Sequence, residues 1–246
     1  MRDLTEKRTD SGFFSRLRRQ VAKDIRVVFE RDPAAKNVWE VVLCYSGLHA
    51  LWLYRLAHFL YVRDFVLLPR LISNFARFVT GIEIHPGAVI GDGLFIDHGT
   101  GIVIGETAIL GKNVTLYQGV TLGGTGKEKG KRHPTLGNNV VVATGAKVLG
   151  SFTVGDHAKI GAGSVVLKEV PPYATVVGIP GRVVVMNGKR VYDETELEAE
   201  NDVDLDHCAL PDPEADFDMK LVEQIRALEE KVALLEQKLK EKNNNA

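Results

Sequence analysis

Two histidines in this 246-residue sequence each stand beside a charged residue where a regular repeat is interrupted. Asp97 and His98 lie in IDHGTG, and Arg132 and His133 lie in GKRHPT. An unprotonated imidazole can take a proton from a hydroxyl group when a carboxylate fixes its tautomer and stabilises the cation that forms. The sequence therefore predicts proton-transfer chemistry at these interruptions.

The acid that orients His98 is predicted to come from a neighbouring turn of the repeat. Adjacent side chains on an extended strand point to opposite faces, so we expect Asp97 and His98 to project to opposite sides. Glu83 is the nearest candidate for the orienting acid. Glu106 is a second candidate, although its IGET stretch also fits the repeat without a functional role.

The repeat around these residues has a period of six. Aliphatic residues recur at this step from Ile84 to Val166, at thirteen positions in three runs. A second small or apolar residue, such as Ala88 or Thr100, follows each of them after four residues. The pattern is typical of a parallel β-helix, in which stacked coils bury continuous columns of aliphatic side chains.

The period breaks at two places, and each break carries a histidine. The first adds two residues to one six-residue step, directly after Asp97 and His98. The second contains GGTGKEKGKRHPT, which is too rich in Gly and Lys to form a buried face. We expect a loop excursion over 123–135 that carries Arg132 and His133.

The N-terminal part is predicted to be helical. Apolar residues at spacings of three and four over 13–30 indicate an amphipathic helix, whose basic face we interpret as solvated. RDPA at 31–34 predicts a helix start, because Asp can cap free N–H groups and Pro fits the first turn. Residues 38–80 predict two or three further helices. The result is an α-helical domain over 1–80 followed by a β-helix domain over 81–185.

Two further segments follow the predicted β-helix. Residues 186–218 are strongly acidic, which favours an exposed linker, with a weak edge strand as the alternative. Residues 219–242 place apolar residues alternately four and three apart, which is an unbroken heptad seam. We interpret this segment as a coiled-coil helix for self-association, and a surface helix packed on the body is the alternative.

Composition excludes several classes of partner. A net charge of −1 gives no basic field for nucleic acid, and two distant cysteines without metal-ligand spacing fit a reducing compartment. Cys44 lies in an apolar helical stretch, where we expect a buried thiol. No secretory signal is visible, and charged residues interrupt the most apolar region, 48–80. We therefore expect a cytoplasmic protein without nucleic-acid, membrane or metal binding.

Several stretches of the sequence resemble serine O-acetyltransferases of the hexapeptide acyltransferase superfamily. IDHGTG, VTLGGTGK and RHP occur in this order, and the resemblance covers roughly residues 24–185. It implies a left-handed parallel β-helix and transfer of the acetyl group of acetyl-CoA to the hydroxyl of L-serine. The products would be O-acetyl-L-serine and CoA, in the first step of cysteine biosynthesis from serine, with feedback inhibition by L-cysteine.

The same resemblance implies roles for individual residues. His98 matches the general base for direct attack on the thioester, and Glu83 stands where many members have the Asp that partners this base. Asp97 is implied to bind the ammonium group of serine, and Arg132 and His133 are implied to bind its carboxylate and reacting end. Asp32 matches an aspartate that reaches the amino-acid site of a neighbouring subunit. The coenzyme A groove between subunits is implied to include Gly124, Thr144, Lys159, Ala162 and Arg182.

The resemblance also implies a homotrimer or a dimer of trimers. Members that dock into O-acetylserine sulfhydrylase end in a flexible tail with a terminal Ile, whereas this sequence ends in Ala246, which argues against that complex. Three other functions stay open. The first is a hexapeptide O-acetyltransferase with a sugar or other hydroxyl acceptor. The second is a β-helical zinc lyase, although His98 and His133 lack a further histidine at the close spacing that such a zinc site needs. The third is a non-catalytic scaffold.

Overall fold

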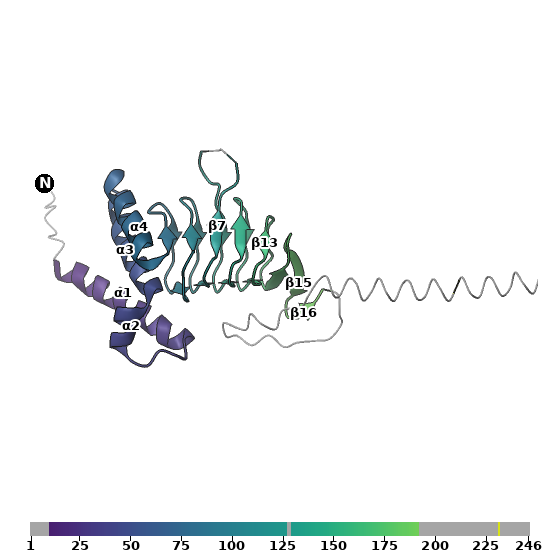
Figure 1. Cartoon of the computed structure of the whole chain (residues 1–246), viewed down its shortest axis with the longest axis horizontal. Helices are drawn as coiled ribbons and strands as arrows, with labels where there is room; N and C mark the ends of the chain where they lie inside the picture. Colours follow the sequence, from purple (N-terminus) through teal and green to yellow (C-terminus); the bar gives the residue numbers. More distant parts are fainter. Residues whose placement is uncertain (1–9, 127–128, 192–230, 232–246) are drawn as a thin grey trace, which may run out of the picture. The chain divides into compact units, whose positions relative to one another are not determined.

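The computed structural model describes residues 10–126, 129–191 and 231. Within this part of the chain, four helices precede a series of short strands (Figure 1). The helices are α1 (Asp10–Arg31), α2 (Val38–Cys44), α3 (Ser46–Tyr61) and α4 (Leu67–Thr80). The helices predicted over 13–30 and 38–80 are therefore confirmed, the second region as three helices. The helix start predicted at RDPA is wrong, because Asp32 follows the end of α1 and α2 begins only at Val38, with Asn37 as its N-cap. All named elements belong to one compact unit, Met1–Cys208.

The strands β1 to β14 form a parallel β-helix with three faces. The first face contains β1 (Glu83–Ile84), β4 (Val103–Ile104), β7 (Thr121–Gly123), β10 (Lys147–Leu149) and β13 (Val165–Val166). The second contains β2 (Val89–Ile90), β5 (Ile109–Leu110), β8 (Thr135–Leu136) and β11 (Thr153–Val154). The third contains β3 (Phe95–Ile96), β6 (Thr115–Leu116), β9 (Val141–Val142), β12 (Lys159–Ile160) and β14 (Ala174–Val177), and it continues into the antiparallel strands β15 (Arg182–Met186) and β16 (Lys189–Arg190).

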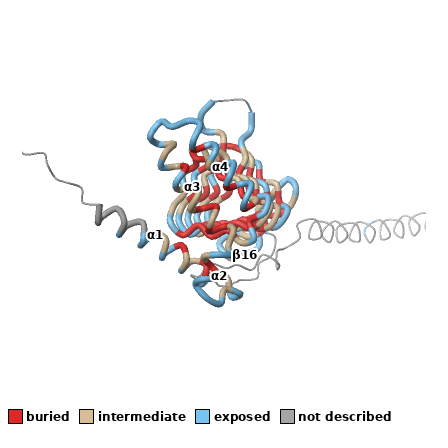
Figure 2. Tube along the Cα trace, turned by 60° about the vertical axis from the view of Figure 1, so that its left-hand side comes forward, coloured by how far each residue is buried: buried red, intermediate tan, exposed pale blue. Residues whose placement is uncertain are grey.

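The predicted aliphatic columns are confirmed. On the first face Ile84 pairs with Ile104, and Ile104 pairs with Leu122, so that residues of the six-residue repeat lie directly above one another. These residues are buried inside the coils, and Figure 2 colours the buried residues red along the chain. One detail of the prediction is wrong: Thr100 is exposed, and Ile102 is buried in its place. The two added residues lengthen the corner before β4 and shift the inward position from Thr100 to Ile102.

Helix α3 closes the N-terminal end of the β-helix. Its residues Ala50, Leu51 and Tyr54 belong to the same buried cluster as the aliphatic columns. The Tyr54 hydroxyl donates a hydrogen bond of 2.6 Å to the carbonyl of Ala88. Gly47 lies so close to the third face that an added Cβ would come within 2.4 Å of the Ile96 carbonyl oxygen. An open end of aliphatic coils needs such a cover, because it would otherwise expose apolar surface.

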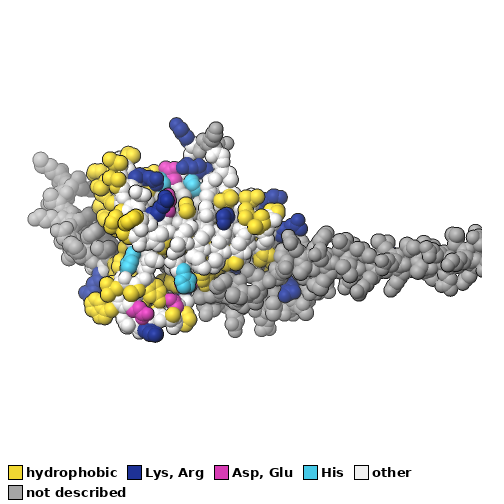
Figure 3. All heavy atoms as spheres, in the orientation of Figure 1, with side chains coloured by type: hydrophobic (Ala, Val, Ile, Leu, Met, Phe, Trp, Pro, Cys, Tyr) yellow, Lys and Arg dark blue, Asp and Glu magenta, His cyan; other side chains and the backbone are white. Residues whose placement is uncertain are grey.

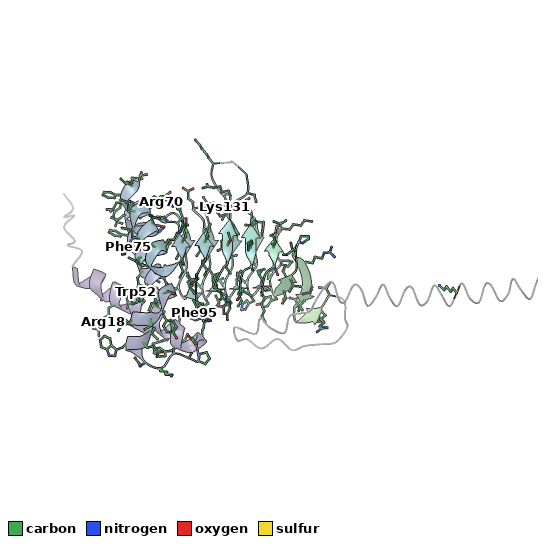
Figure 4. All side chains as sticks on the ribbon, in the orientation of Figure 1. Arg18, Trp52, Arg70, Phe75, Phe95 and Lys131 are labelled. Carbon is green, nitrogen blue, oxygen red and sulfur yellow. The ribbon has the colours of Figure 1, made fainter. Side chains whose placement is uncertain are left out.

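Helices α1 and α2 are fastened to the side of the same structure. Val28, Val41, Leu48 and Phe95 form a second buried cluster, and Trp52 packs against it (Figure 4). The Arg31 guanidinium donates to the Thr115 hydroxyl at 2.8 Å. Burial lowers the pKa of Arg31. These contacts fix the C-terminal end of α1, and with it Asp32, against the third face of the β-helix.

Several sequence predictions fall outside the described residues. They are most of the acidic segment, 192–218, and the heptad segment 219–242 apart from residue 231. The antiparallel strands β15 and β16 continue past Val185, where the sequence predicts the start of the linker.

Cys44 is exposed at the end of α2, so the prediction of a buried thiol is wrong. None of the helices in the described ranges is long and apolar enough to cross a membrane.

Candidate functional site

The predicted site residues lie mainly at two edges of the β-helix, where the chain turns from one face to the next. The His98 edge joins the third face to the first and consists of the corners 97–102, 117–120, 143–146 and 161–164. The His133 edge joins the first face to the second and consists of the corners 85–88, 105–108, 124–134 and 150–152. Each break in the repeat is therefore a longer corner at one of these edges.

His98 projects from the lengthened corner of the His98 edge. Its backbone is left-handed, with φ of 57°, and its side chain is 75% exposed. Its Nε2 lies 3.8 Å from Oδ1 of Asp97. The prediction that Asp97 and His98 point to opposite sides is therefore wrong. The alternation rule applies to extended backbone, and His98 sits in a turn.

Residues from the helical region lie near Asp97 and His98 at this corner. The Ser46 hydroxyl donates to the His98 carbonyl at 3.2 Å, and the Tyr45 hydroxyl donates to Oδ2 of Asp32 at 2.6 Å. Burial, the bond to Asp32 and the negative charges of Asp32 and Asp97 all raise the pKa of Tyr45. The structure thus brings Asp32, Asp97 and His98 to one edge. Tyr45 and Ser46 carry no sequence motif, and the sequence prediction missed them.

Glu83 is engaged by a different residue. Its Oε2 accepts a hydrogen bond of 3.0 Å from Arg77, and within residues 10–126 and 129–191 no hydrogen bond or ion pair joins it to His98. The second candidate acid, Glu106, lies on the His133 edge. The carboxylate that contacts His98 in this chain is that of Asp97, and the pairing of Glu83 with His98 stays a prediction.

The loop that leaves the first face after β7 returns through Arg132 and His133 (Figure 1). Arg132 forms a short ion pair with Glu106, which also accepts a hydrogen bond of 3.2 Å from the Tyr61 hydroxyl. The bond from Arg132 lowers the pKa of Glu106. Basic, acidic and histidine side chains gather at the base of this loop (Figure 3), where Lys131 is labelled in Figure 4. This edge thus carries a fixed guanidinium beside a histidine.

The His133 ring is packed between two glycines. His133 is only 8% exposed. A Cβ added at Gly105 would lie 2.0 Å from Cδ2 of His133 and 2.1 Å from its Nε2. A Cβ added at Gly124 would lie 3.2 Å from the same Nε2. Burial and the nearby Arg132 cation lower the pKa of His133, so the ring is neutral at pH 7. Gly105 is one of many glycines that follow a repeat position, so the sequence did not single it out.

The five residues predicted to line the coenzyme A groove are divided between parts of the fold. Thr144 and Ala162 lie on the His98 edge in stacked corners, where the Gly163 N–H donates to the Thr144 carbonyl at 2.8 Å. A Cβ added at Gly145 or Gly163 would meet nothing within 4 Å, so this part of the edge is open. Lys159 lies on β12, Arg182 begins β15, and Gly124 begins the loop of the His133 edge.

No metal centre is evident in the described part of the chain. No group of three or more His, Cys, Asp or Glu side chains there could hold a metal ion. His49 and His58 each bond a backbone carbonyl at 2.7 Å, and His157 stacks on Tyr173. These three histidines are therefore occupied in structural contacts.

Comparisons with known proteins identify the family. The model of the N-terminal domain of serine acetyltransferase matches residues 3–52, and the model of bacterial transferase hexapeptide repeats matches residues 133–168. The serine acetyltransferase of Bacillus subtilis (strain 168) is 61% identical over 210 residues, covering 85% of this chain and 92% of the relative. The chain belongs to the serine acetyltransferase family.

Solved structures of serine acetyltransferases share its fold. The enzyme of Neisseria gonorrhoeae in complex with serine is 43% identical, with a TM-score of 0.67 and coverage of 70% of each chain. A serine acetyltransferase in complex with cysteine is also 43% identical, with a TM-score of 0.68 and coverage of 72% of this chain and 70% of its own. The helices and the β-helix described above are thus those of a serine acetyltransferase.

The packing of His133 against Gly105 makes a testable prediction. The Gly105→Ala substitution should push the imidazole out of place and lower the rate of acetyl transfer by about 10²-fold, the order expected for an ångström-scale misplacement. Steady-state kinetics with L-serine and acetyl-CoA measure this effect.

The double variant Gly105→Ala, His133→Ala is the control. If Gly105 acts through His133, the double variant should be no slower than His133→Ala alone. If the loss of activity in the double variant instead equals the combined losses of the two single variants, with thermal unfolding unchanged, Gly105 acts by another route.

Proposed function

We propose that this member of the serine acetyltransferase family uses His98 as the general base when it transfers the acetyl group of acetyl-CoA to the hydroxyl of L-serine. The observation that carries the proposal is the exposed His98 imidazole, held 3.8 Å from the Asp97 carboxylate on an edge that is open toward Thr144 and Ala162. A neutral imidazole in this setting can accept the hydroxyl proton, and the adjacent carboxylate stabilises the imidazolium.

The reaction needs no acyl-enzyme intermediate. His98 accepts the proton of the serine hydroxyl while the serine oxygen bonds to the carbonyl carbon of the thioester. The tetrahedral species then expels the CoA sulfur, which takes the proton from the imidazolium. The products are O-acetyl-L-serine and CoA, and His98 returns to its starting state.

We assign the ammonium group of serine to acidic side chains and its carboxylate group to hydrogen-bond donors. Asp97, with Asp32 held by Tyr45, supplies negative charge for the ammonium group. Arg132 and His133 supply donors for the carboxylate. L-Cysteine has the same ammonium and carboxylate groups, so we expect it to compete at this site as a feedback inhibitor. The relatives solved with serine and with cysteine support this assignment.

We further propose that each site is formed by two copies of the chain. The His98 edge and the His133 edge border opposite sides of the first face. At about 3.3 Å per residue, a face of six residues separates its edges by roughly 15–20 Å, several times the length of serine. One chain therefore cannot present both edges to one substrate. In a cyclic trimer, the His98 edge of each left-handed β-helix would meet the His133 edge of the next.

The remaining assignments follow this arrangement. The open column of corners below His98, with Thr144 and Ala162, would receive the pantetheine arm of acetyl-CoA, and Gly124 would face it from the next subunit. Lys159 and Arg182 would contact its phosphates. We propose that the heptad segment 219–242 adds self-association beyond the β-helix, with the acidic segment 186–218 as its linker.

The role of His98 can be tested by thiol release from acetyl-CoA with and without L-serine. The His98→Asn variant should lose serine-dependent release by about 10²–10⁴-fold, the usual contribution of a general base. His157→Asn is the matched control, because His157 also occupies a left-handed corner, with φ of 58° against 57° for His98. Equal losses in both variants would assign the effect to backbone strain and reject His98 as the base.

The shared site predicts complementation between inactive variants. His98→Asn and Arg132→Gln chains, co-expressed in equal amounts, should assemble at random, so that about a quarter of all sites combine an intact His98 with an intact Arg132. About a quarter of the wild-type activity should therefore return. Mixed trimers confirmed by native mass spectrometry but lacking activity would place both residues in a site within one chain.

A further inference from the structure

We propose that Thr107 is a positioning residue that holds His133 in the tautomer with its proton on Nε2. His133 then serves as a hydrogen-bond donor to the amino-acid substrate and cannot serve as a base. The location of the proton follows from contacts within the chain. The consequence for the substrate rests on the proposed function of the site.

Thr107 lies in the corner between β4 and β5, directly below the returning loop. Its hydroxyl oxygen accepts hydrogen bonds from the backbone N–H groups of Arg132 at 3.0 Å and His133 at 3.2 Å. The same oxygen lies 2.9 Å from Nδ1 of His133, and the Thr107 N–H donates to that Nδ1 at 3.2 Å. The Thr107 carbonyl accepts from Lys131 at 2.8 Å. One threonine thus binds three successive residues of the loop.

The hydrogen-bonding capacity of a hydroxyl group fixes the direction of these bonds. A threonine hydroxyl has two lone pairs and one hydrogen. The backbone N–H groups of Arg132 and His133 occupy both lone pairs, so the hydroxyl hydrogen is left for Nδ1. The Thr107 N–H can only donate. Two donors therefore converge on Nδ1 of His133, which must be the unprotonated nitrogen.

The surroundings of the ring oppose a second proton. Burial lowers the pKa of His133 most, and the Arg132 cation lowers it further, whereas the Glu106 carboxylate opposes them with a smaller effect than either. The neutral ring therefore carries its single proton on Nε2. This nitrogen lies beside Gly105 and Gly124, and it has no hydrogen-bond partner among the protein groups that the structure describes.

The two histidines of the site consequently have different chemistry. His98 is exposed on its edge beside Asp97, where it can take a proton. His133 is locked as a donor, suited to a carboxylate oxygen of the amino acid. Arg132 is placed by the same threonine, because the Thr107 hydroxyl holds its backbone N–H as well as that of His133. Thr107 therefore sets both predicted carboxylate-binding groups without touching the substrate.

Nitrogen NMR of the full chain labelled with ¹⁵N-histidine tests the tautomer directly. Long-range proton–nitrogen correlations, assigned to His133 with the His133→Asn variant, should show an imine-type Nδ1 and a protonated Nε2. A protonated Nδ1, or averaging of the two nitrogens in the wild-type protein, would overturn the proposal. This measurement does not depend on activity, so it can succeed even if the proposed function fails.

Thr107→Val and Thr107→Ser form a matched pair, because valine has nearly the same shape as threonine and serine keeps the hydroxyl. Thr107→Val removes the hydroxyl donor but keeps the backbone N–H that donates to Nδ1, so the tautomer protonated on Nε2 should become less dominant. KM for L-serine should rise by about tenfold, the loss of roughly one good hydrogen bond, with a smaller change in kcat. Thr107→Ser should keep the wild-type tautomer and KM.

Two results would contradict the role of Thr107. The first is a valine variant with the wild-type tautomer and KM, and the second is a serine variant that fails as the valine variant does. Circular dichroism and native mass confirm that each variant is folded and assembled. Absence of serine-dependent acetyl transfer in the wild-type chain would instead reject the proposed function and leave the tautomer result standing.

Discussion

The stacking of aliphatic side chains inside the β-helix is the constraint on which the rest of the structure depends. Ile84, Ile104 and Leu122 pair in sequence across the first face, and the other faces repeat this arrangement. A residue added within a face would shift every later side chain out of its column and bury polar groups. Extra residues are therefore confined to the corners, and the edges of the β-helix are where this fold can carry chemistry.

Each functional edge combines a lengthened corner with partners from elsewhere in the chain. At the His98 edge, the corner is joined by Tyr45 and Ser46, which the contact of α3 with the third face brings into place. At the His133 edge, the loop is fastened by Thr107 from the coil below. In the proposed mechanism the His98 edge presents the base, and the His133 edge presents a neutral and a cationic donor. This division suits a substrate with an ammonium group, a carboxylate and a hydroxyl.

Much of the fold could be predicted from the sequence, because the six-residue period reports the packing of each coil directly. Asp97 and His98 do not point to opposite sides as predicted, because His98 adopts a left-handed turn in a corner whose geometry the six-residue period does not describe. The contact between Thr107 and His133 had a usable signal. Ile109 pairs with Thr135 across the second face, and counting back two residues on each strand places Thr107 opposite His133. The contacts of Tyr45 and Arg77 depend on how the helices pack, and no repeat in the sequence indicates which helical residues lie opposite one another.

A crystal structure of the assembled protein with L-serine bound would show directly whether two copies of the chain form the site. We predict that the serine ammonium group contacts Asp97 and its hydroxyl contacts His98 of one chain, while its carboxylate contacts Arg132 and His133 of a second chain. Serine held by all four residues of a single chain, or bound away from His98, would contradict the proposal that two edges of different copies form the site.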